Sequence, residues 1–241
     1  MEAEILALEE VVGGYGKLTV LNGTSFKVAR GAITTLIGPN GAGKSTVFKT
    51  VFGLLPVERG RIVFEGREIT NLDPQRLLKL GISYVPQGRN VFPELSVRHN
   101  LELGATAAGE GTPIAARIES LMDRFPMLRR KAGAQASTLS GGEQKLLEIA
   151  RGLLLEPKLM LIDEPSIGLS PRLVQDIFGI LQDLRAKGVT ILMVEQNAKR
   201  ALEISDFGVV LELGHTRVEG AAHAILADPR VGQLFLGGGL A

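Results

Sequence analysis

One stretch decides the fold of this 241-residue chain: Gly38-Pro39-Asn40-Gly41-Ala42-Gly43-Lys44-Ser45. It fits the pattern G-x-x-x-x-G-K-[ST], in which the backbone amides of a glycine-rich loop hold phosphate groups. The pattern is informative only between a strand and a helix, and the sequence predicts a buried strand at 32–37 and a helix at 44–52. A glycine-rich turn with a chance lysine would not explain this agreement. We therefore predict an α/β fold with a nucleoside triphosphate site.

Each part of this loop, residues 38–45, has an expected task. The backbone amides of residues 40–44 should surround the phosphates, Lys44 should meet the β and γ oxygens, and Ser45 should bind Mg²⁺. Lys44 is thereby a candidate catalytic residue as well as a ligand of ATP. The residues expected to contact the nucleotide here are Gly38, Pro39, Asn40, Gly41, Ala42, Gly43, Lys44, Ser45 and Thr46.

A second glycine-rich element, called the signature stretch below, comprises Leu139-Ser140-Gly141-Gly142-Glu143-Gln144 and opens a helix predicted at 143–155. Ser140 and Glu143 fit the capping box S-x-x-E, which on its own would make the element a simple helix start. A cap does not explain two adjacent glycines, which lower helix stability, whereas close approach of a phosphate to bare backbone does. We expect ATP to contact Ser140, Gly141, Gly142 and Glu143. Because a triphosphate needs two helix N-termini only when it is gripped from both sides, the pair predicts an ATPase that works as a dimer.

Two acids follow the apolar run Leu159-Met160-Leu161-Ile162. A buried strand at 159–163 would deliver Asp163 to its carboxyl end, where α/β sheets bind ligands. Asp163 is the expected partner of Mg²⁺, directly or through water, and Glu164 is the expected general base that orients the attacking water. The alternative is a strand end whose two carboxylates are merely solvated. The phosphate-binding loop in the same chain makes the catalytic interpretation the stronger one.

Composition narrows the function classes. The chain has 27 Lys and Arg and 26 Asp and Glu. The net charge of +1 is not the basic excess expected of a nucleic-acid-binding protein. The lack of cysteine excludes disulfides, thiolate metal ligands and a cysteine nucleophile. The first residues are acidic, unlike a signal peptide, and no apolar run approaches the roughly 20 residues that span a bilayer. We expect a soluble, cytoplasmic protein that reaches a membrane through another polypeptide.

The predicted elements divide the chain into a catalytic core, 1–86 and 156–241, and a helical subdomain, 87–155, that carries the signature stretch. Strands are predicted at 5–12, 25–29, 32–37, 61–64, 82–85, 159–163 and 189–194, and a hairpin at 207–213 and 215–218. Helices are predicted at 44–52, at 74–80 after the cap Asp73, and at 97–103, 114–125, 143–155 and 171–187. The glycines at 237–239 suggest a loose tail.

In their order along the chain, these motifs resemble those of the ATP-binding cassette family. The resemblance implies a P-loop NTPase, with a RecA-like core built on a parallel sheet, an N-terminal antiparallel β-subdomain and an inserted helical subdomain. It also implies that Tyr15 stacks on adenine and that Gln87 is the residue that senses Mg²⁺ and the transmembrane partner. Residues 166–169 resemble the loop that crosses the dimer interface, although the family more often has Ala-Leu-Asp there.

One position departs from the family. Most cassettes place a histidine after the strand predicted at 189–194, whereas this chain has Val194-Glu195-Gln196-Asn197. Gln196 is a candidate catalytic residue that can donate a hydrogen bond to the γ-phosphate but cannot become cationic. Strong hydrolysis through a histidine switch is therefore not expected. The three histidines, His99, His215 and His223, are interpreted as surface or packing residues.

The sequence 194–197, the stretch 86–93 and the short length resemble the smaller cassette of branched-chain amino acid importers, whose relatives serve urea and short-chain amide uptake. The resemblance implies two transmembrane permeases, a longer cassette paralogue or a self-dimer, and indirectly a periplasmic solute-binding protein. The cassette would lie at the cytoplasmic face of the inner membrane. A soluble cassette of DNA repair, translation or iron–sulfur assembly is the alternative. Repair cassettes usually carry a long coiled coil and translation types two fused cassettes, neither of which this chain has, and Gln196 argues against the iron–sulfur type.

Overall fold

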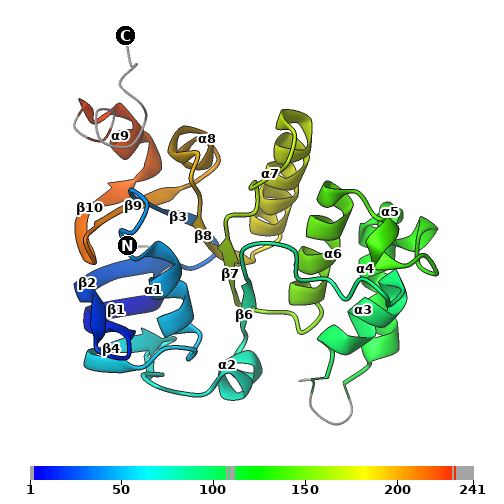
Figure 1. The fold of residues 1–241 in the computed structure, drawn as a ribbon, viewed down its shortest axis with the longest axis horizontal. Coiled ribbons are helices and arrows are strands. Elements are labelled where there is room, and N and C mark those ends of the chain that lie inside the picture. Colours follow the sequence, from blue (N-terminus) through cyan, green and yellow to red (C-terminus); the bar gives the residue numbers. More distant parts are fainter. Residues whose placement is uncertain (1–2, 107, 109–111, 230, 232–241) are drawn as a thin grey trace.

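The computed structural model describes residues 3–106, 108, 112–229 and 231, and Figure 1 shows two sheets on one side and a group of helices on the other. The four-stranded sheet has the order β2 (Leu18–Ala29), β1 (Glu4–Tyr15), β4 (Val57–Phe64) and β5 (Arg67–Glu68). Its strand pairs are antiparallel. The predicted N-terminal antiparallel sheet is confirmed.

The six-stranded sheet carries the parallel core. Its order is β10 (His215–Ala221), β9 (Phe207–Glu212), β3 (Ile33–Ile37), β8 (Thr190–Val194), β7 (Leu159–Asp163) and β6 (Ile82–Val85). The five strands from β9 to β6 are parallel, and β10 pairs with β9 as an antiparallel edge hairpin. Every residue of β3, β7 and β8 is buried, as expected for strands covered on both faces.

The described helices follow from the same local signals. They are α1 (Lys44–Val51), α2 (Pro74–Leu80), α3 (Val97–Gly104), α4 (Ile114–Arg124), α5 (Pro126–Arg130), a 3-10 turn (Ala136–Thr138), α6 (Gly141–Leu153), α7 (Pro171–Ala186), α8 (Ala198–Glu203) and α9 (Ala222–Ala227). The cap predicted for α2 is present, because Asp73 Oδ1 accepts a hydrogen bond from the Arg76 backbone amide over 2.9 Å. None of the helices in the described part of the chain combines the length and apolarity that a membrane span requires.

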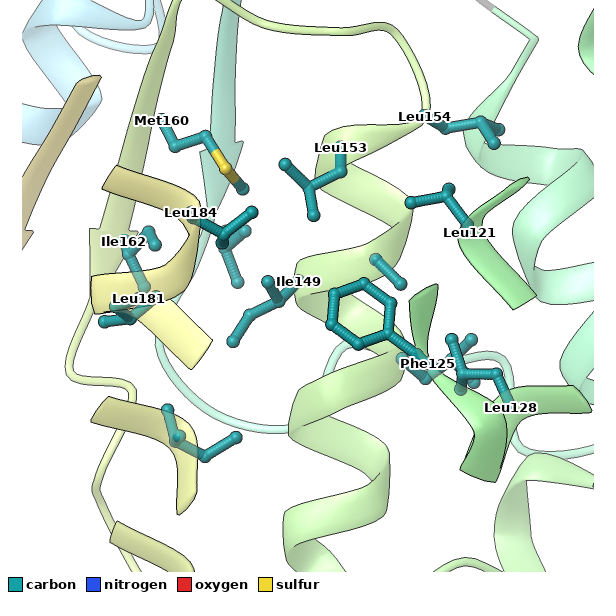
Figure 2. Close-up of a cluster of buried hydrophobic side chains, with 14 of the residues drawn as sticks. Leu121, Phe125, Leu128, Ile149, Leu153, Leu154, Met160, Ile162, Leu181 and Leu184 are labelled. Carbon is teal, nitrogen blue, oxygen red and sulfur yellow. The ribbon is translucent and has the colours of Figure 1, made fainter. Parts of the chain in front are cut away.

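Alternate residues of β7 pack into two different hydrophobic cores. On β7, Leu161 packs into the core shared with the four-stranded sheet and α1, whereas Met160 and Ile162 pack into the core formed with the helices. Figure 2 shows Ile149 and Leu153 of α6 between these strand residues and α7 on one side and side chains of α4 and α5 on the other. Helix α6 therefore ties the helical segment to the sheet.

Several predicted boundaries were wrong. The helix predicted at 143–155 begins at Gly141 and ends at Leu153, because the capping box fixes its start at Ser140. The strands predicted at 5–12 and 25–29 extend to 4–15 and 18–29, with irregular register near Leu8 and Val11 that breaks the alternation of apolar residues. The short elements β5, α5, α8 and α9 had no predicted counterpart, and residues 237–239 lie outside the described part.

Candidate nucleotide and catalytic site

The carboxyl ends of four parallel strands bring the candidate residues to one edge of the sheet. The glycine loop follows β3, Asp163 ends β7, Gln87 lies two residues after β6, and Gln196 lies two residues after β8. Parallel strands expose this edge, where α/β folds bind their ligands. The topology therefore places residues from four separate stretches of sequence at a common site.

The glycine loop wraps around the head of Lys44. The residue is 6% exposed, and its Nζ donates to the carbonyl oxygens of Gly38 at 2.8 Å and Pro39 at 3.0 Å. Burial lowers the pKa of Lys44 below its ordinary value, and the carboxylates of Glu164 and Asp163 offset part of that shift. A desolvated ammonium whose hydrogen bonds go to neutral carbonyl groups is suited to an incoming polyanion.

The start of α1 is left without a side-chain cap. Gly43 occupies the cap position with φ 102°, a left-handed conformation that favours glycine. Within the described part of the chain, α1 has no side-chain cap hydrogen bond, so the amides of its first turn remain available at the positive end of the helix dipole. This geometry suits phosphate binding.

Asp163 is held by two hydroxyl groups. It is 2% exposed; Ser45 Oγ donates to Oδ1 and the Tyr84 hydroxyl donates to Oδ2, each over 3.3 Å. Burial raises the pKa of Asp163, the Ser45 hydrogen bond opposes this, and the charge of Glu164 adds to it. Burial and the Asp163 charge also raise the pKa of Tyr84. Tyr84, which packs against Phe48, was not singled out in the sequence because nothing local distinguishes it from a core aromatic.

One carboxylate oxygen of Glu164 accepts hydrogen bonds from two side-chain amides. Gln87 Nε2 donates to Glu164 Oε2 over 2.6 Å, and Gln196 Nε2 donates to the same atom over 2.9 Å. Glu164 is 6% exposed and has φ 48°, a left-handed conformation that costs a non-glycine residue free energy. A buried carboxylate with a fixed orientation, on a residue with a strained backbone, is the arrangement expected of a catalytic base.

A second buried acid, Glu195, fixes the backbone beside Gln196. Glu195 is 2% exposed; its Oε1 accepts from the Ser166 amide at 2.9 Å and its Oε2 from the Gln196 amide at 3.1 Å. Burial raises the pKa of Glu195 despite these hydrogen bonds. The carboxylate thus joins the segment 166–169 to the strand end that carries Gln196, a link between distant segments that no local pattern indicated.

The signature stretch forms the expected capping box. The Ser140 amide donates to Glu143 Oε2 over 2.8 Å, and the Glu143 amide donates to Ser140 Oγ over 3.4 Å. The glycines have different surroundings: Gly141 is half-buried, whereas Gly142 is buried and a Cβ there would lie 2.7 Å from Leu173 Cδ2. Packing against α7 is therefore a second reason for Gly142. Figure 1 shows α6 separated from α1 by β6 and β7, so this stretch does not join the cluster around Lys44.

Tyr15 lies at the end of β1, beside α1. Its side chain is 42% exposed, its hydroxyl accepts from Lys49 Nζ over 3.2 Å, and the same Nζ lies 5.4 Å from the ring centroid.

The interpretation of the histidines as surface residues agrees with the exposure of His99, His215 and His223.

The residues present fit magnesium. Within the described ranges, no group of three or more His, Cys, Asp or Glu side chains could hold a metal ion by itself. Ser45 Oγ and the Asp163 carboxylate nevertheless offer hard oxygen ligands side by side. Mg²⁺ commonly takes one or two protein ligands and completes its shell with substrate phosphates and water.

Comparisons with known proteins agree with this geometry. A family model described as ABC transporter matches residues 21–167. The chain is 40% identical over 234 residues to the high-affinity branched-chain amino acid transport ATP-binding protein BraG of Pseudomonas aeruginosa, covering 97% of this chain and 100% of BraG. It is 33% identical over 240 residues to the lipopolysaccharide export system ATP-binding protein LptB of Acidithiobacillus ferridurans, covering 98% of each.

A solved structure gives the same answer for the fold. The ADP conformation of MJ1267, an ATP-binding cassette of an ABC transporter, superposes with a TM-score of 0.86 at 34% identity, covering 98% of this chain and 99% of that one. The matching family model, the full-length relatives and the cluster around Lys44 and Glu164 lead to one assignment. The chain belongs to the ABC transporter family and is one of its ATP-binding, ATP-hydrolysing cassettes.

Proposed function

We propose that this cassette energises the uptake of branched-chain or other hydrophobic amino acids. The observation that carries the proposal is the 40% identity to BraG, named for branched-chain amino acid transport, over 97% of this chain and 100% of BraG. The similarity to LptB, named for lipopolysaccharide export, is lower at 33%. Val194-Glu195-Gln196-Asn197, the feature that pointed to the short importer cassette, supports the same assignment.

The nucleotide is held by the loop of residues 38–45. Lys44 leaves the carbonyl oxygens of Gly38 and Pro39 for the β and γ phosphates, because a phosphate offers the ammonium a charge that neutral carbonyls lack. The uncapped amides of α1 receive the remaining phosphate oxygens, and Tyr15 stacks on adenine. Mg²⁺ held by Ser45, Asp163 and Gln87 would neutralise charge on the transferring phosphoryl group.

Glu164 acts as the general base. Both amide donors bind its Oε2, and among the described residues no hydrogen bond engages Oε1. The attacking water therefore donates to Oε1 and transfers its proton there as its oxygen bonds to the γ-phosphorus and ADP leaves. Gln87 and Gln196 hold the carboxylate in place, and Gln196 can also donate to the γ-phosphate.

The site is completed by a second cassette. Helix α6, which begins directly after Ser140, is separated from α1 by β6 and β7 (Figure 1), and Ser140 is exposed. Ser140, Gly141 and Gly142 bind the nucleotide held by a partner cassette, together with Glu143, and the partner's equivalent stretch closes over Lys44. The partner is a longer paralogue or a second copy of this chain, beneath two permeases at the cytoplasmic face of the inner membrane, with a periplasmic solute-binding protein acting indirectly.

Uptake by the reconstituted transporter tests the proposal. The cassette, purified with its membrane partners and placed in vesicles containing ATP at the cassette face, should import labelled leucine when the solute-binding protein is supplied on the opposite face. Unlabelled isoleucine and valine should compete, whereas urea and acetamide should not. ATP-dependent uptake of urea or acetamide with no leucine uptake would contradict the assignment, and so would ATP-dependent movement of a lipid in the outward direction.

A further inference from the structure

Three charged side chains follow the signature stretch along α6, at intervals of three residues: Lys145, Glu148 and Arg151. Lys145 is 5% exposed and Glu148 is 4% exposed, and Arg151 is half-buried one turn further on. Lys145 Nζ and Glu148 Oε2 form an ion pair of 2.5 Å. A buried ion pair contributes little net stability, because desolvation of both charges offsets their attraction. Apolar residues at these two positions would stabilise the buried face of α6 equally well. The ion pair therefore suggests a role other than stability.

All three side chains reach the segment 88–92 that follows Gln87. Lys145 Nζ donates to the Gly88 carbonyl over 3.0 Å, and Glu148 Oε1 accepts from the Asn90 amide over 2.5 Å. Arg151 Nη1 donates to the Asn90 carbonyl over 2.9 Å, and its guanidinium lies 5.2 Å from the centroid of the Phe92 ring. The backbone of Asn90 is thus held at both its amide and its carbonyl.

The side chain of Asn90 links the segment held by α6 to Gln87. Asn90 Nδ2 donates to the carbonyl oxygens of Pro86 and Gln87, each over 3.1 Å, which closes residues 86–90 into one turn. Gln87 in turn donates to Glu164 Oε2 over 2.6 Å. A continuous path of hydrogen bonds therefore runs from the charged face of α6 to the carboxylate of Glu164.

We propose that Lys145, Glu148 and Arg151 are positioning residues that fix Gln87 against Glu164. The inference rests on the proposed roles of Gln87 and Glu164 in hydrolysis. Because α6 also carries Ser140 at its start, the helix that closes over a partner's nucleotide is the helix that sets the geometry of this chain's own base. A displacement of α6 would move Gln87 with it.

The competing explanation is an ordinary ion pair between residues three apart on one helix. Charge reversal separates the two explanations. The double substitution Lys145→Glu with Glu148→Lys keeps an ion pair within α6. It also turns a carboxylate toward the Gly88 carbonyl and an ammonium toward the Asn90 amide, so that acceptor faces acceptor and donor faces donor. The anchor is lost while the helix pair is kept.

The experiment combines ATP hydrolysis, nucleotide affinity and a reporter in the anchored segment. The chain has no tryptophan, so Phe92→Trp supplies a single probe whose ring can still contact Arg151. In this background the reversal should lower kcat severalfold, up to about tenfold, because Gln196 still holds Glu164 Oε2. It should leave Mg-ATP affinity within about twofold, as expected when positioning is lost and binding is kept. The fluorescence anisotropy of the tryptophan should fall. Glu148→Gln, which keeps an oxygen acceptor for the Asn90 amide, should retain most of the activity and anisotropy.

Two further variants serve as a control for charge reversal and as a second test of the anchor. Reversal of the exposed pair Lys27 and Glu4, whose charged atoms lie 2.8 Å apart, controls for charge reversal and should change nothing. Asn90→Leu removes the two side-chain bonds to Pro86 and Gln87 without touching α6, and it should lower kcat as the reversal does. If the charge-reversed protein fails to fold, the kcat of Asn90→Leu tests the proposal in its place. Wild-type kcat in a folded reversal variant, or in Asn90→Leu, would overturn the proposal.

Gln87→Ala distinguishes failure of this inference from failure of the proposed function. If Gln87→Ala lowers kcat and the anchor variants do not, the anchor alone is wrong. If Gln87→Ala leaves kcat unchanged, the proposed role of Gln87 fails and the anchor proposal fails with it.

Discussion

Gln196 donates its side-chain amide to Glu164 Oε2 over 2.9 Å, across two parallel strands of the same sheet. An amide at this position holds the carboxylate without changing its own charge, whereas a histidine could become cationic. Gln87 donates to the same oxygen over 2.6 Å. Glu164 is therefore oriented by two neutral donors that act on a single atom.

This shared oxygen predicts non-additive losses. Gln196→Ala should lower kcat by about tenfold or less, since one hydrogen bond to a charged group is lost and Gln87 still restrains the carboxylate. The variant Gln87→Ala with Gln196→Ala should lose more than the product of the two single effects, because only then is the carboxylate free to rotate. Steady-state ATP hydrolysis by the four proteins of this cycle measures the coupling. Single losses that simply multiply would show that the two amides act independently.

Lys44→Ala should weaken Mg-ATP binding by at least about tenfold, the cost of removing a charge-assisted hydrogen bond to phosphate. The fold should persist, because among the described residues Lys44 Nζ donates to the carbonyls of its own loop and to no other element. Titration calorimetry on the variant measures the affinity, and Lys17→Ala, in the turn between β1 and β2, is a control that should bind normally. Unchanged ATP affinity in Lys44→Ala would mean that the loop is not the nucleotide site.

Asp163→Asn should raise the melting temperature of the nucleotide-free protein at neutral pH. Burial raises the pKa of Asp163, so the folded chain releases this proton at higher pH than the unfolded chain does. Stability therefore falls as pH rises through the window between the ordinary and the raised pKa, and the penalty persists above it. The advantage of the variant should vanish below about pH 4, where the carboxyl is protonated in both states.

Calorimetric melting of the two proteins between acid and neutral pH checks this prediction. An advantage that is constant across that range would show that titration of Asp163 is not its source. A variant that melts below the natural protein at neutral pH would contradict the prediction outright.

The parts of the site that the sequence predicted are those carried by local patterns. The glycine loop, the strand that ends at Asp163 and the capping box at Ser140 each occupy a few consecutive residues. The shared edge of the sheet then follows from parallel strands. Lys44, Ser45, Asp163 and Glu164 could be placed together in this way before the structure was known.

The rest depends on contacts between distant segments. Tyr84 binds Asp163, and Glu195 binds the Ser166 amide, across gaps in sequence that no periodicity spans. Charged residues such as Lys145 and Glu148 normally indicate a solvated helix face, and only tertiary packing shows that theirs is buried against the turn at Asn90. The signature glycines were assigned to phosphate alone, although Leu173 supplies a packing reason for Gly142.

Glu164→Gln tests the central claim most directly, because it replaces the proposed base with a side chain of the same size that cannot accept the proton of the attacking water. ATP hydrolysis and Mg-ATP affinity are measured on the same preparation, and light scattering reports the dimer with and without ATP. We predict that kcat falls about 100-fold or more, that ATP remains bound, and that ATP shifts the variant toward the dimer. A kcat reduced no more than a few-fold, with ATP affinity unchanged, would show that Glu164 is not the base.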